Sequence, residues 1–65
     1  MSQREAREMA RIRQELRERL MSDRHADAGE VLARLRNMAE RHVGLTDEYE
    51  RWRIRFELLA KTASA

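Results

Sequence analysis

Residues 45–63, LTDEYERWRIRFELLAKTA, hold the most regular apolar pattern of the chain. Apolar side chains recur in this stretch at alternating spacings of four and three residues: Leu45, Tyr49, Trp52, Phe56, Leu59 and Ala63. This spacing places them along one face of an α-helix. The stretch also contains every aromatic residue of the protein. We therefore predict a helix over about residues 47–63, capped by Thr46 or Asp47, whose aromatic face forms the centre of the core.

The N-terminal part of the chain predicts a first helix over about residues 2–21. Its apolar positions form one stripe, with spacings of three and four residues: Met9, Ile12, Leu16 and Leu20. Ser2 followed by Glu5 is the pattern of a capping box, in which each side chain accepts a hydrogen bond from the backbone of the other residue. We expect this pair to fix the start of the helix.

A second helix is predicted over about residues 28–42. Its apolar face consists of Val31, Leu35, Met38 and His42, flanked by Ala28, Leu32 and Ala39. Asp27 with Glu30 repeats the capping-box pattern. Gly44 follows the last apolar position, and glycine ends helices because it adopts the left-handed conformation without a steric penalty. Residues 22–26, which contain no Pro or Gly, are compatible with either a turn or a kink.

These segments predict an all-α fold, a small antiparallel three-helix bundle in one domain over residues 1–65 with frayed termini. The alternative is a helical hairpin, in which the first two segments form one kinked helix and dimerisation completes the core. So short a chain buries only about 60% of the surface of its unfolded form. It has no Cys and only two His, so disulfides and a thiolate zinc site are excluded. Self-association or docking on a partner is the remaining source of stability.

Ile54 and Leu58 do not fit a single buried face of the third helix. At about 100° per residue they lie nearly opposite the aromatic stripe, so one core cannot bury both sides. Isolated exposed apolar residues are common on protein surfaces, but a small domain gains stability from additional burial. We therefore expect Ile54 and Leu58, with neighbouring Arg51 and Arg55, to contact a second copy of the chain, another protein, or both.

Arginine supplies thirteen of the fourteen basic residues, yet the formal net charge is only +2. Arg4, Arg7 and Arg11 share the face of the first helix opposite its apolar stripe, where they would suit contacts with phosphates. However, Arg4–Glu8, Arg11–Glu15 and Glu15–Arg19 have the four-residue spacing of ion pairs within a helix. We therefore expect a largely ion-paired surface. Binding of nucleic acid through Arg4, Arg7 and Arg11 is the alternative function.

Other functional classes have weaker support in the sequence. A helix-turn-helix is disfavoured because Asp47, Glu48 and Glu50 open the third helix, where a recognition helix meets phosphates. Asp23, His25 and Asp27 are close together but match no conventional spacing of metal ligands, so we expect no metal and no cofactor. The sequence has no nucleophile turn and no glycine-rich phosphate loop. We therefore expect no enzymatic activity.

Residues 1–20 lack the apolar core of a signal peptide, and no apolar run approaches the about 18 residues of a membrane span. A cytoplasmic location without membrane binding is therefore expected. Taken together, the sequence predicts a small, non-catalytic helical protein–protein interaction module. It would act as a regulatory, adaptor or assembly protein and would self-associate.

Overall fold

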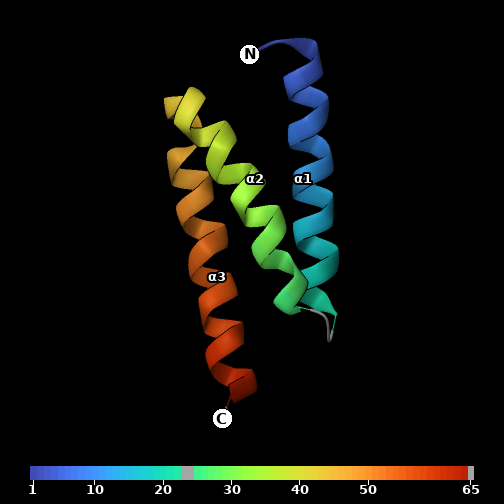
Figure 1. Ribbon diagram of the computed structural model, residues 1–65, viewed down its shortest axis with the longest axis vertical. Coiled ribbons are helices and arrows are strands. Elements are labelled where there is room, and N and C mark those ends of the chain that lie inside the picture. Colours follow the sequence, from blue (N-terminus) through green and yellow to red (C-terminus); the bar gives the residue numbers. More distant parts are fainter. Residues whose placement is uncertain (23–24, 65) are drawn as a thin grey trace.

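Three α-helices and two short 3-10 helices make up the computed structural model, which describes residues 1–22 and 25–64 (Figure 1). The α-helices are α1 (Gln3–Met21), α2 (Ala28–Arg41) and α3 (Thr46–Ser64), and the 3-10 helices are η1 (His25–Asp27) and η2 (Val43–Leu45). In Figure 1, α1 and α3 run in the same direction, and α2 runs against both of them. The predicted all-α three-helix bundle is confirmed. The alternative with one kinked N-terminal helix is wrong, because α1 and α2 are separate helices that pack side by side.

The start of α1 follows its sequence signal. The Ser2 hydroxyl oxygen accepts a hydrogen bond from the Glu5 backbone N–H at 3.1 Å, and the Ser2 backbone N–H donates to Glu5 Oε1 at 3.1 Å. The predicted capping box at Ser2 is therefore present. It satisfies two donors that a helix N-terminus would otherwise leave without an intrahelical partner.

The predicted capping box at Asp27 is wrong. Asp27 has helical backbone angles, with φ −72° and ψ −13°, and its side chain makes no capping hydrogen bond. A side-chain cap requires an extended backbone at the capping residue. Because η1 leads directly into α2, Asp27 instead continues the helical path of the backbone.

The predicted left-handed stop at Gly44 is also wrong, since no described residue has a positive φ. Helix α2 ends because His42 is extended, with φ −133° and ψ 100°, while its N–H still donates to the Met38 carbonyl at 3.0 Å. Gly44 lies within η2, where the Leu45 N–H donates to the His42 carbonyl at 2.9 Å. A short 3-10 turn therefore joins α2 to α3 without a left-handed residue.

The fully enclosed part of the core lies mainly between α1 and α2. Its buried residues are Met9, Ile12, Leu16, Leu20, Ala28, Val31, Leu32, Leu35, Met38 and Leu45. The aromatic face of α3 packs against this cluster but stays partly exposed: Tyr49, Trp52, Phe56 and Leu59. The prediction that this face is the centre of the core is therefore wrong. Helix α2 lies between the other two (Figure 1). Besides α1 and α2, only the short η1 and η2 pack against α3 in the described residues, which leaves its large side chains partly exposed.

The burial pattern predicts different costs for the same truncation at two leucines. Leu35 is 0% exposed, and removing its buried methyl groups in Leu35→Ala should lower the free energy of unfolding by about 2–5 kcal/mol. Leu58 is 61% exposed, so Leu58→Ala should change it by less than about 0.5 kcal/mol. Urea unfolding followed by circular dichroism measures both values. Equal losses in the two variants would contradict this assignment of the core.

Candidate functional site

Three exposed apolar side chains surround one surface groove, which lies between the last turns of α1 and the middle of α3. Met21 is 87% exposed, Ile54 50% and Leu58 61%. The complete lining consists of Arg17, Leu20, Met21, Arg51, Ile54, Arg55, Leu58 and Leu59. It encloses about 670 Å³ and is open to solvent. We call it the α1–α3 groove.

The structure brings all four predicted interface residues, Ile54, Leu58, Arg51 and Arg55, to the α1–α3 groove. It adds Arg17 and Met21 from α1, which the sequence analysis did not identify. Met21 directly follows Leu20, the last residue of the buried stripe, so its own side chain falls off that stripe. This departure from the spacing of the buried stripe could have identified Met21 as an exposed apolar residue. Nothing in the periodicity of α1, however, indicates that Met21 lies next to α3.

Ile54 and Leu58 also border a second hollow on the other side of α3. Its lining includes Phe56, Glu57 and Lys61. The two exposed side chains therefore form a short apolar ridge between two hollows. Such a ridge is accessible from both sides to a molecule that packs along α3.

The arginines of the described chain divide equally into two classes. Six lie within 4.0 Å of a carboxylate oxygen: Arg13, Arg19, Arg34, Arg36, Arg41 and Arg53. Six others form no such ion pair in residues 1–22 and 25–64: Arg4, Arg7, Arg11, Arg17, Arg51 and Arg55. Arg24 lies outside the described residues. The arginines without ion pairs gather in two places, and one of them is the α1–α3 groove.

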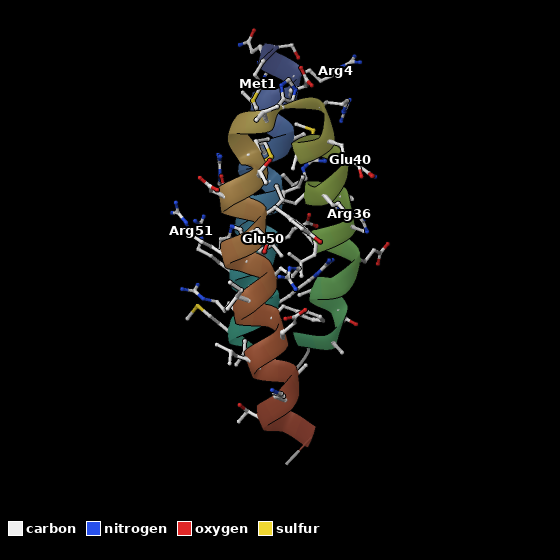
Figure 2. All side chains as sticks on the ribbon, turned by 90° about the vertical axis from the view of Figure 1, so that its left-hand side faces the viewer. Met1, Arg4, Arg36, Glu40, Glu50 and Arg51 are labelled. Atoms are coloured by element: carbon white, nitrogen blue, oxygen red, sulfur yellow. The ribbon has the colours of Figure 1, made fainter. Side chains whose placement is uncertain are left out.

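The charge at the α1–α3 groove has one sign. Arg17, Arg51 and Arg55 all line it, and none of its eight lining residues is a carboxylate. The Arg55 guanidinium lies 5.4 Å from the centre of the Trp52 ring, a cation–π contact that leaves its charge uncompensated. Figure 2 shows Arg51 extending outward from α3. The groove therefore combines an apolar floor with three cationic side chains.

The second group consists of Arg4, Arg7 and Arg11, which line a polar hollow beside α2 together with Gln3, Glu8 and Arg34. Two of the ion pairs predicted for this face, Arg4–Glu8 and Arg11–Glu15, are not formed, so the expectation of a largely paired surface is wrong here. Glu15 instead accepts a hydrogen bond from Arg34 of α2 and lies 3.7 Å from Arg19. An exposed pair within one helix contributes little free energy, so a pairing between helices readily replaces it.

A two-point ion pair fixes α1 against α3. Arg13 Nε and Nη2 donate to the Glu48 carboxylate at 2.7 and 2.9 Å, and Trp52 Nε1 donates to the same carboxylate at 3.4 Å. The hydrogen bonds from Arg13 lower the pKa of Glu48, and those to Glu48 raise the pKa of Arg13. Paired parallel hydrogen bonds restrict geometry as well as add energy. Because Arg17 follows one turn after Arg13, this contact sets the register of the two walls of the groove.

The N-terminal end of α1 is held by another polar contact. Glu5 Oε2 lies 2.6 Å from His42 Nε2, which donates to it, and Arg41 approaches the same oxygen at 4.0 Å. The hydrogen bonds from His42 and from the Ser2 backbone lower the pKa of Glu5 from an ordinary value of 4.5 to about 2. The contact thus ties the start of α1 to the end of α2.

The metal candidate suggested by the sequence includes Asp23, which lies outside the described residues. Within residues 1–22 and 25–64, no group of three or more His, Asp or Glu side chains is placed to hold a metal ion. No helix in the described part of the chain is long and apolar enough to cross a membrane.

The Glu5 contact predicts a specific acid sensitivity. A carboxylate whose pKa falls on folding stabilises the protein above its unfolded pKa, and this contribution is lost as the pH falls from about 4.5 to about 2. In Glu5→Gln the side chain does not titrate, so stability should fall less over this range than in the unchanged protein. Urea unfolding at several pH values measures the difference. Glu18→Gln controls for the loss of one carboxylate. An unchanged pH dependence in Glu5→Gln would refute the assignment.

Comparisons with known proteins do not assign the chain to a family. No family model matches the sequence, and no curated protein or solved structure matches it either. The chemistry of the two arginine groups and of the apolar ridge is therefore the basis for a functional proposal.

Proposed function

We propose that this protein is a small, non-catalytic protein–protein interaction module that acts as a regulatory, adaptor or assembly protein. The α1–α3 groove is its binding surface. One observation carries this proposal: Met21, Ile54 and Leu58 lie around one groove, and each of these apolar side chains is at least half exposed. Contiguous exposed apolar surface bordered by polar groups is typical of interaction sites.

The composition of the groove supports the same proposal. Methionine and arginine are enriched in protein interfaces relative to the rest of the surface, and this groove contains Met21 and three arginines. Its eight lining residues include no histidine, carboxylate or hydroxyl group that would act as a general base or nucleophile. Either a second copy of the chain or a different protein would bury the ridge, and both are protein interactions.

Photo-crosslinking tests the proposal without knowledge of the partner. Leu58, in the groove, is replaced by p-benzoylphenylalanine, and the same residue is introduced at Asn37, which is exposed on α2 away from the groove. Illumination in cells that naturally produce the protein should give discrete protein adducts from position 58 and none from position 37. Addition of Ile54→Glu should abolish the adducts, because it places a charge in the buried contact. Absence of adducts from position 58 would refute the proposal.

Binding of nucleic acid is a second candidate function. It is favoured by one observation, the absence of ion pairs at Arg4, Arg7 and Arg11, which leaves three cationic groups available on one face of α1. Glu8 lies among them and would repel phosphate. The wide spread of acidic residues over the chain is a further argument against it.

A gel-shift titration tests this second function. With Arg4, Arg7 and Arg11 contacting phosphates, the affinity for a mixed-sequence oligonucleotide should weaken steeply as salt rises, by roughly one power of salt concentration per contact. Arg4→Gln with Arg7→Gln and Arg11→Gln should remove this dependence. The matched variant carries the same change at Arg17, Arg51 and Arg55 and should retain it. No shift at low salt would exclude the function.

A further inference from the structure

We infer that the α1–α3 groove receives an acidic amphipathic helix from a different protein. This inference rests on the proposed function and specifies the chemistry of the partner. The groove presents apolar side chains and three guanidinium groups without ion pairs, and none of its lining residues is acidic. A complementary surface has apolar residues at its centre and Asp or Glu beside them.

A helical partner fits the shape of the groove. Its two walls are helices that run in the same direction, α1 and α3 (Figure 1), and their side chains line an open channel between them. Amphipathic helices bind such channels with apolar residues spaced three and four apart along one face. Docking would convert the three-helix bundle into a four-helix arrangement, in which Met21, Ile54 and Leu58 become core residues.

The charges beside the ridge argue against a second copy as the occupant. Arg51 precedes Ile54 by three residues and Lys61 follows Leu58 by three, so both lie on the same face of α3 as the ridge. If two copies paired α3 in antiparallel fashion about the midpoint of the ridge, Arg51 would lie opposite Lys61 of the second copy. In a parallel pair, the two Arg51 side chains would face each other. In the antiparallel pair Glu57 would lie opposite Arg55, but Glu57 is already paired with Arg53 at 2.7 Å. The like charges of Arg51 and Lys61 therefore oppose association.

Head-to-tail binding between copies is disfavoured by the rest of the surface. In the described chain, the large exposed apolar side chains outside the groove are Met1 and Val43. Neither belongs to a helical row of apolar residues flanked by carboxylates, since Met1 precedes α1 and Val43 lies in η2. The described residues therefore supply the groove but not its complement.

A peptide titration tests the inference. The probe is a designed helical peptide of about 20 residues with leucines along one face and glutamates beside them. It is compared with one substituted peptide in which lysines replace the glutamates and another in which serines replace the leucines. Fluorescence anisotropy should show that the acidic peptide binds at least about tenfold more tightly than either substituted peptide, given three partly exposed charge contacts and the buried ridge.

Two charge-reversed variants distinguish binding of the peptide in the groove from nonspecific attraction of an acidic peptide to a basic protein. Arg17→Glu with Arg51→Glu and Arg55→Glu should reverse the preference between the acidic and lysine peptides. Arg4→Glu with Arg7→Glu and Arg11→Glu carries the same net change away from the groove and should preserve the preference. Equal binding of the serine peptide, or loss of preference in both variants, would show nonspecific attraction of anions and overturn the inference.

Sedimentation velocity of the protein alone distinguishes failure of this inference from failure of the proposed function. The inference expects a monomer mass across a concentration series. A dimer that Leu58→Glu dissociates would overturn the acidic partner while leaving the interaction function intact. A lack of crosslinks at Leu58, by contrast, would remove both.

Discussion

Helix α2 packs along both of its neighbours, whereas α1 and α3 meet each other at only a few positions, with the Arg13–Glu48 ion pair among them. This asymmetry shapes the rest of the molecule. The buried cluster forms where α1 and α2 are in close contact, and the aromatic side chains of α3 complete it from one side. No helix in residues 1–22 and 25–64 covers the opposite side of the α1–α3 contact. The groove thus lies where a fourth helix would pack in a four-helix arrangement.

Electrostatics complement this arrangement of helices. Carboxylates on α1 and α3 are drawn into contacts between elements: Glu15 with Arg34, Glu48 with Arg13, and Glu5 with His42. These acids neutralise charge at the helix interfaces, whereas six other arginines of the described residues form no ion pair. The balanced net charge of the chain therefore conceals an uneven distribution of ion pairs among its arginines. In the part of the chain that the structure describes, the arginines without ion pairs form two clusters of positive charge on the surface.

Most of the secondary structure could be predicted from the sequence because its signals are local. Apolar spacing determines which segments form helices, and the same helical geometry places Ile54 and Leu58 away from the core face. The capping box at Ser2 is local as well.

The predictions were wrong where the conformation or the pairing of a residue depends on its neighbours in space. Asp27 and Gly44 were misjudged because 3-10 turns set their backbone conformation. Glu15 keeps its predicted pair with Arg19, but it pairs with Arg34 of α2, nineteen residues further along the chain, and not with Arg11. Arg17 and Met21 join the groove only because α1 and α3 are adjacent in three dimensions.

The central position of α2 also has a kinetic consequence. Most packing between elements joins helices that follow one another directly in the chain, and such local contacts require little loop-closure entropy. The α1–α3 contact is different, since it closes across the whole of α2. The two N-terminal helices and the last two can therefore associate as hairpins before the groove exists. The groove is then complete only when both hairpins share α2, so the proposed partner, which needs both walls, would distinguish the finished fold from its precursors.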